Sequence, residues 1–90
     1  MKRPIEHVFT SPNFDKAFAG LPQGIQETAR IKDQWFRLDA FHPGLRTHKL
    51  TGKLQDRWAY WINRDYRIVF RFLDGHSVLY LDIGTHDVYR

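Results

Sequence analysis

Residues 66–84 read YRIVFRFLDGHSVLYLDIG, and this run predicts two strands joined by a tight turn. β-Branched and aromatic residues recur on both sides of Asp74-Gly75, which is typical of paired strands. Both turn residues tolerate a positive φ angle, so they favour a hairpin with a two-residue loop. We therefore expect strands at Tyr66–Leu73 and Ser77–Gly84.

A two-residue loop would also fix how these strands pair. One face would then be apolar, and the opposite face would carry charge, with Arg67 opposite Asp82. The pairs expected on the apolar face are Ile68 with Leu81 and Phe70 with Leu79. The sheet would therefore bury one face under helices and leave the other open.

The residues on the N-terminal side predict a helical hairpin. Apolar residues at helical spacing follow a serine–proline start over residues 11–21, because serine can cap a helix and proline fits its first position. Pro22 ends that helix, and a second helix is expected from about Gln23 to Asp39. Further strands are expected at Ile5–Phe9 and Trp58–Asn63.

The expected fold class is α+β, as one domain over residues 1–90. An N-terminal strand and a two-helix hairpin would pack on one face of a mainly antiparallel β-sheet. The 90 residues are 42% hydrophobic, enough for a single core,. Neither a signal peptide nor an apolar run of the roughly 18 residues that span a membrane is visible. The chain has no cysteine, so we expect a cytoplasmic protein without disulfides or thiolate metal sites.

The net charge of +4 is unevenly distributed along the chain. Residues 41–72 hold seven basic and two acidic side chains, a net charge of +5, whereas residues 73–90 carry −2. A basic block of this kind suits a polyanionic partner. Charge alone separates neither RNA from DNA nor either of them from an acidic protein.

Three segments resemble parts of one known family. They are residues 42–53 (HPGLRTHKLTGK), 63–70 (NRDYRIVF) and 82–90 (DIGTHDVYR). The first resembles the segment before the second strand of RelE-type toxins, and the second resembles the most recognisable strand of that family. The ending IGTH is similar to the YafQ-like branch. The order of elements resembles the RelE/ParE toxin superfamily along nearly the whole chain.

This resemblance implies a function. It implies the toxin of a type II toxin–antitoxin system, which cuts mRNA in the ribosomal A site and so blocks translation. The implied partners are a cognate antitoxin, the ribosome and its mRNA, and no membrane. Two alternatives stay open: a ParE-like inhibitor of DNA gyrase, and a catalytically inactive module that binds RNA or an antitoxin.

Metal-free RNA cleavage sets chemical requirements that can be compared with the residues present. The ribose 2′-hydroxyl attacks the adjacent phosphorus, which needs a base, an acid for the departing 5′-oxygen, and cations around the phosphorane. Histidine suits the first two roles and arginine the third. No metal or cofactor is required. The candidate catalytic residues are His48, Asp65, Arg67, His86 and Tyr89.

Each candidate has an expected role, which the resemblance supplies. His48 and His86 would be the base–acid pair, in an order that the sequence leaves open. Asp65 would orient one imidazole, Arg67 would hold the scissile phosphate, and Tyr89 would stack on a base or supply a proton.

Further residues are expected to bind RNA without taking part in the chemistry. They are Arg46, Lys49, Lys53, Arg57, Arg64 and Trp61. The chain departs from its relatives in the strand before Asn63. Some RelE-type enzymes use lysines there, where this chain has Trp58 and Tyr60, and the YafQ-like branch has a further histidine where this chain has Trp61. A two-histidine mechanism is therefore expected in place of a lysine-based one.

Overall fold

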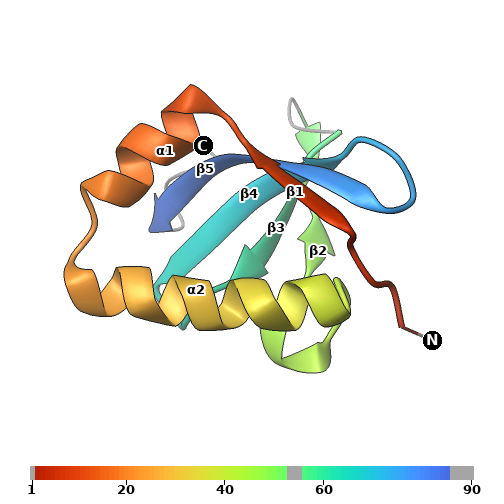
Figure 1. Cartoon of the computed structure of the whole chain (residues 1–90), viewed down its shortest axis with the longest axis horizontal. Helices are drawn as coiled ribbons and strands as arrows, with labels where there is room; N and C mark the ends of the chain where they lie inside the picture. The colour runs from red at the N-terminus through yellow and green to blue at the C-terminus, as the bar shows by residue number, and fades with distance from the viewer. Residues whose placement is uncertain (1, 53–55, 86–90) are drawn as a thin grey trace.

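The computed structural model describes residues 2–52 and 56–85. Within these ranges the elements are β1 (His7–Thr10), α1 (Pro12–Ala19), α2 (Gln23–Leu38), the short 3₁₀ helix η1 (Pro43–Leu45), β2 (His48–Lys49), β3 (Trp58–Trp61), β4 (Tyr66–Phe72) and β5 (Ser77–Thr85). Figure 1 shows their arrangement. The expected order of a strand, a helical hairpin and three C-terminal strands is confirmed, and the structure adds η1 and β2 between α2 and β3.

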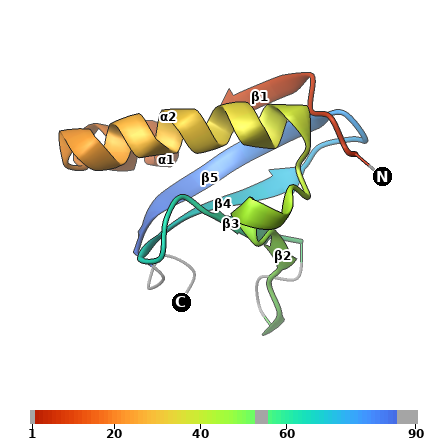
Figure 2. The same ribbon diagram turned by 90° about the horizontal axis from the view of Figure 1, so that it is seen from below.

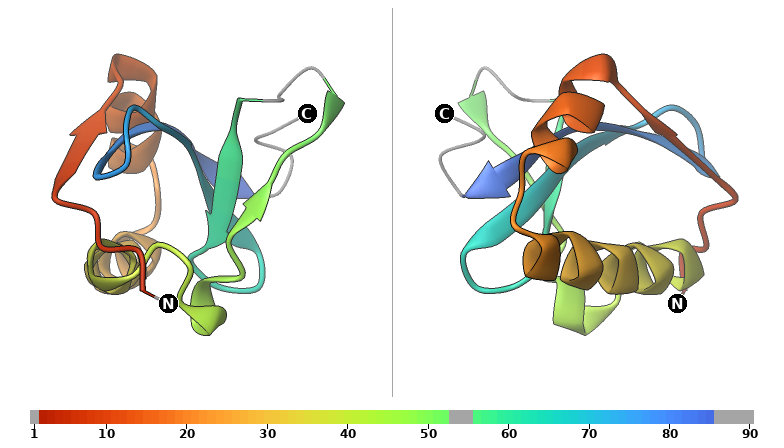
Figure 3. Two further views of the ribbon diagram at one scale, coloured as in Figure 1. Left: turned by 90° about the vertical axis from the view of Figure 1, so that its right-hand side faces the viewer. Right: turned by 60° about the vertical axis from the view of Figure 1, so that its left-hand side comes forward.

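The described strands form one sheet in the order β1-β5-β4-β3-β2, in which the β1–β5 pair is parallel and the others are antiparallel. Both helices cover the same side of this sheet (Figure 2). The sheet twists, so that its edge strands β1 and β2 lie on opposite sides of the molecule (Figure 3),. The predicted α+β class with a mainly antiparallel sheet is confirmed.

The helices begin and end for the expected reasons. The Ser11 hydroxyl accepts a hydrogen bond from the Phe14 N–H at 3.0 Å, and a proline occupies the first turn of α1,. Helix α2 ends at Leu38, one residue before the predicted end. No helix in the described ranges is long and apolar enough to cross a membrane.

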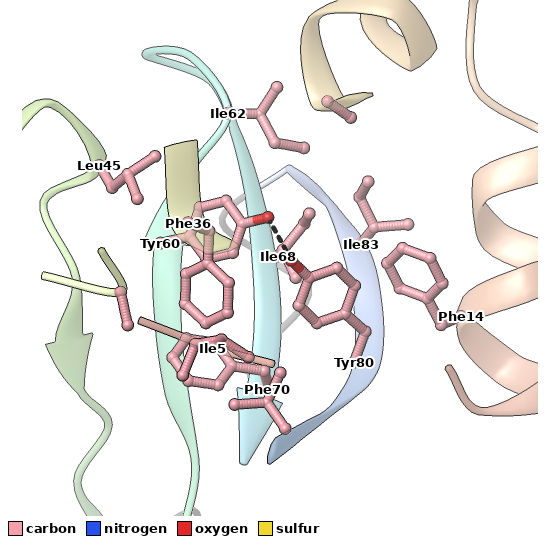
Figure 4. Close-up of a cluster of buried hydrophobic side chains, with 13 residues drawn as sticks. Ile5, Phe14, Phe36, Leu45, Tyr60, Ile62, Ile68, Phe70, Tyr80 and Ile83 are labelled. Atoms are coloured by element: carbon pink, nitrogen blue, oxygen red, sulfur yellow. Dashed lines mark hydrogen bonds between the residues drawn. The ribbon is translucent and has the colours of Figure 1, made fainter. Parts of the chain in front are cut away.

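Phe36 of α2 is the centre of the core between the helices and the sheet. It is fully buried, and its ring centroid lies 4.7 Å from that of Tyr60, 4.8 Å from that of Phe70 and 5.8 Å from that of Tyr80. Figure 4 shows these rings together with the aliphatic side chains of β4 and β5. A single aromatic side chain thus joins α2 to three neighbouring strands.

A chain of hydrogen bonds passes through this core. The Tyr80 hydroxyl donates to the Asp33 carboxylate at 2.6 Å, so the Tyr60 hydroxyl, 2.9 Å away, must donate to the Tyr80 oxygen (Figure 4),. Burial raises the pKa of both phenols well above the usual value, which keeps both protonated,. Asp33 in turn accepts from Arg37 at 3.0 Å. Both buried phenol groups and the Asp33 carboxylate therefore have hydrogen-bond partners.

The turn between β4 and β5 is longer than predicted. The Asp74 carboxylate accepts a hydrogen bond from the His76 N–H at 2.7 Å. This bond stabilises a turn with one residue more than the two-residue loop. The hydrogen bond from the His76 backbone lowers the pKa of the Asp74 carboxyl group. Phe70 consequently pairs with Tyr80, and the predicted pairing of Phe70 with Leu79 is wrong.

A β-bulge changes the pairing a second time. Phe70 pairs with Tyr80 but Val69 pairs with Asp82, so Leu81 is the extra residue in β5,. Its carbonyl accepts hydrogen bonds from the Ser11 hydroxyl at 3.0 Å and the Asn13 amide at 3.1 Å. The start of α1 thus holds the bulge in place.

Two further predictions fail because the longer turn and the bulge each shift the pairing by one residue. Ile68 pairs with Ile83 instead of Leu81, and Arg67 pairs with Gly84 instead of Asp82. The bulge nevertheless keeps the apolar side chains of both strands turned toward the helices, since Ile68 and Ile83 both belong to the core.

The opposite face of the sheet is less open than predicted. Leu50, Ala59 and Val69 form a second buried cluster there, and Leu81 packs against it. The charged side chains on this face therefore surround a small apolar patch, and do not cover the face as a whole.

The buried tyrosines allow a test of the core hydrogen bonds. Tyr80→Phe should lower the free energy of unfolding by about 1–3 kcal/mol, because it leaves the buried Tyr60 O–H without an acceptor. Tyr60→Phe should cost less, because Tyr80 can still donate to Asp33. Urea unfolding measures both, and the double variant should be less destabilised than the sum of the two. Equal stability of Tyr80→Phe and the parent would contradict the assigned direction of the bonds.

Candidate functional site

Cross-strand pairing brings candidate residues together on the face of the sheet away from the helices. His48 lies opposite Ala59, which lies opposite Val69. Two residues along the same strands, Trp61 lies opposite Arg67. Because side chains two residues apart share a face, His48, Trp61 and Arg67 are all on the face that carries the second apolar cluster.

Trp61 is in contact with two arginines from different parts of the chain. The guanidinium carbon of Arg67 lies 4.2 Å from the centroid of the indole ring, and that of Arg46 lies 4.7 Å from it. A cation over an indole ring is attracted by the negative π face. We call these residues the Arg46–Trp61–Arg67 cluster. It places two positive charges beside a flat, half-buried aromatic ring.

Arg67 is bound mainly to the protein itself. The residue is only 8% exposed, and its Nη1 atom donates to the carbonyls of Asn63, Arg64 and Tyr66 at 3.1, 2.9 and 3.2 Å. Within the described part of the chain its Nε atom is buried without a hydrogen-bond partner. This guanidinium therefore holds the β3–β4 turn and the face of Trp61, and little of its surface reaches solvent.

Asn63 shapes that turn, although it was not among the predicted site residues. Its side-chain oxygen accepts the N–H groups of Asp65 and Tyr66, each at 2.9 Å. The sequence Asn-Arg-Asp is a recognisable signal for such a side-chain-supported turn. Asp65 is exposed in this turn, and its predicted contact with an imidazole stays a prediction.

His48 occupies the first position of β2 and is half-buried. Its Nδ1 atom lies 2.9 Å from the backbone carbonyl oxygen of Arg46. Arg46 adopts the left-handed conformation, with φ 51° and ψ 40°, at the end of η1. The same residue thus contacts the His48 ring through its backbone and the Trp61 ring through its side chain.

The other basic candidates in the described ranges have exposed side chains. They are Lys49, Arg57 and Arg64. Asp56 lies 3.9 Å from Arg57 and 3.9 Å from Arg71, distances at which exposed ion pairs contribute little,. Three predicted residues lie outside the described ranges: Lys53, His86 and Tyr89. Among residues 2–52 and 56–85, no three histidine, aspartate or glutamate side chains gather as a metal site would require.

A cavity of about 160 Å³ lies on the helix side of the sheet. Val8, Phe14, Phe18, Ile68 and Tyr80 are among its mainly apolar lining residues. None of the candidate residues within residues 2–52 and 56–85 lines it, and the cavity is separate from the face that carries His48 and the Arg46–Trp61–Arg67 cluster.

Neither a family model nor a curated protein matches this sequence, whereas several solved structures share its fold. A YoeB/ParE toxin from Agrobacterium tumefaciens superimposes with a TM-score of 0.74 at 13% identity, over 90% of this chain and 99% of that one. The RelBE2 toxin–antitoxin complex from Mycobacterium tuberculosis gives 0.75 at 17% identity, over 93% and 94%. YafQ from Escherichia coli gives 0.68 at 13% identity, over 89% and 92%.

The chain therefore has the fold of RelE, YoeB and YafQ toxins, and the resemblance to the RelE/ParE superfamily is confirmed at the level of fold. The narrower resemblance to the YafQ-like branch stays a prediction.

The structural role of Arg67 can be tested by stability alone. Arg67→Ala should lower the free energy of unfolding by about 1–3 kcal/mol, because partly buried carbonyls in the β3–β4 turn and at the start of β4 lose their donor,. Arg64→Ala is the matched control: this exposed arginine lies in the same turn, and its loss should cost no more than about 0.5 kcal/mol. Urea unfolding compares the two. If both variants were equally stable, Arg67 would not hold the turn.

Proposed function

We propose, from the fold that this chain shares with RelE-, YoeB- and YafQ-type toxins, that the protein is the toxin of a type II toxin–antitoxin pair. We further propose that it is a metal-free endoribonuclease that cuts mRNA in the A site of translating ribosomes in the cytoplasm. The observation that carries the proposal is the shared position of His48, Trp61 and Arg67 on one face of the sheet.

The proposed reaction uses this face as follows. His48 accepts the proton of the ribose 2′-hydroxyl as the 2′-oxygen bonds to the adjacent phosphorus. The bond from phosphorus to the 5′-oxygen breaks, and that oxygen leaves with a proton from the acid, for which His86 is the candidate. The products are a 2′,3′-cyclic phosphate and a 5′-hydroxyl. General acid–base catalysis of this kind contributes about 10²–10⁴-fold per group.

The cations around this face suit RNA. Arg46 is exposed and lies over Trp61, so an unstacked base could lie against the same cluster while its phosphate meets the guanidinium. Lys49, Arg57 and Arg64 would contact phosphates farther along the strand. Arg67 is nearly buried against the Trp61 ring. It would therefore contribute mainly positive charge to this face, and less by direct contact with a phosphate.

The antitoxin belongs to the same proposal. The similar structures from Mycobacterium tuberculosis and Pyrococcus horikoshii are complexes of a toxin with its antitoxin. An uncovered basic nuclease face would be harmful to the cell, so we propose a small partner with an acidic or amphipathic segment, encoded beside this gene.

The catalytic proposal predicts a separation of activity from stability. His86→Ala and His48→Ala should each slow growth arrest and mRNA cleavage by about 10²–10⁴-fold. His76→Ala is the matched control, because this exposed histidine lies in the β4–β5 turn, away from the candidate residues. Growth after a pulse of expression and the melting temperature are measured on the same variants. Full toxicity of the His48/His86 double variant would favour the gyrase-inhibitor alternative.

The partner proposal predicts rescue by the neighbouring gene. Expression of this chain alone should slow growth, and co-expression of the small protein encoded beside it should restore growth and give a stoichiometric complex on gel filtration. A copy of the partner gene with an early stop codon is the control. Abundant expression of the chain alone without any growth defect would contradict the toxin assignment.

A further inference from the structure

The hydrogen bond between His48 and Arg46 fixes which ring nitrogen carries hydrogen. The His48 Nδ1 atom lies 2.9 Å from the Arg46 carbonyl oxygen, and a carbonyl oxygen can only accept a hydrogen bond. Nδ1 must therefore be the protonated nitrogen. In a neutral imidazole with hydrogen on Nδ1, Nε2 holds the lone pair.

From this geometry we propose that His48 acts as the base through Nε2, and that Arg46 is the positioning residue whose backbone carbonyl sets this state. The inference rests on the proposed nuclease function, in which His48 takes the 2′-hydroxyl proton. It adds which ring nitrogen accepts that proton and which residue sets this state. The carbonyl dipole also stabilises the charge that the ring gains when Nε2 accepts the proton.

Arg46 is held in the conformation that aims this carbonyl. Among the described residues it is the one non-glycine with a positive φ angle, a conformation that persists only where the surroundings enforce it. Its N–H donates to the Pro43 carbonyl at 3.3 Å, and its guanidinium lies over Trp61. Leu45 before it is fully buried, and the hydroxyl of Thr47 after it donates to the Ala40 carbonyl.

Arg46 therefore has two separable functions. Its carbonyl contacts the His48 ring, and its guanidinium contacts the Trp61 ring. A glycine needed only to make a left-handed turn would supply the first contact and not the second. This difference allows substitutions that remove one function at a time.

The molecule contains an internal reference for the ring state. His42 Nδ1 accepts the Gly44 N–H at 2.9 Å, so neutral His42 must carry its hydrogen on Nε2. His42 and His48 should therefore show opposite tautomers in one protein.

Nitrogen-15 NMR of the imidazole rings tests the proposal without any measurement of activity. In the folded protein with neutral histidines, His48 should show a protonated Nδ1 and an unprotonated Nε2, and His42 the reverse. Signals are assigned by His48→Gln and His42→Gln. A His48 ring with hydrogen on Nε2 would overturn the inference, whether or not the protein proves to be a nuclease.

A pair of substitutions at one position tests the positioning role. Arg46→Gly permits the positive φ angle and should keep the His48 tautomer, while it weakens RNA binding through loss of the guanidinium. Arg46→Val disfavours that angle. This variant should not show the His48 tautomer of the parent protein, and its maximal cleavage rate should be at least tenfold lower. Loss of the signature in both variants, or its retention in both, would overturn the role of the carbonyl. If Arg46→Val does not fold, the Arg46→Gly spectrum and the parent spectrum decide.

Discussion

Strand β4 is paired along both of its edges, and this double pairing commits its alternate side chains to two opposite faces,. Ile68 and Phe70 point into the core, where Phe36 of α2 packs against them. Arg67 and Val69 point to the other face, where the candidate site lies. A slip of one residue would exchange the two sets. The core and the site are therefore held by the same backbone hydrogen bonds.

The sequence was sufficient to predict the features of the fold that depend on helix capping and on hydrophobic periodicity. The start of α1 at Ser11-Pro12, the end of α2 near Asp39 and the apolar face of β4 all follow from capping and periodicity,. The pairing of β4 with β5 was not predictable in the same way. The turn length depends on one side-chain bond of Asp74, and the bulge at Leu81 is held by side chains at the start of α1, 70 and 68 positions away along the chain.

The candidate site shows the same division. The alternation of residues placed Arg67 on a face away from the helices, and the resemblance singled out His48 and Arg67. The face that Trp61 takes depends on the length of the β3–β4 turn, which the sequence left open. Sequence could not reveal that Arg67 is nearly buried, because its carbonyl partners lie in the β3–β4 turn that Asn63 folds and at the start of β4. Nor could it reveal the left-handed conformation of Arg46. The role of Arg67 in holding the scissile phosphate stays a prediction. In the structure its guanidinium is nearly buried against Trp61, and Arg46 is the exposed cation of the cluster.

Under the proposed function, this face cuts mRNA only when a ribosome presents it. The most direct measurement maps new 5′-hydroxyl ends on a reporter transcript after a brief pulse of expression, beside an identical transcript whose start codon and ribosome-binding site are removed. Because the ribosome would supply the substrate geometry that free RNA lacks, we predict cuts within codons of the translated copy and none in the untranslated copy. Equal cutting of both copies would contradict dependence on the ribosome, and growth arrest without cuts in either would contradict the nuclease itself.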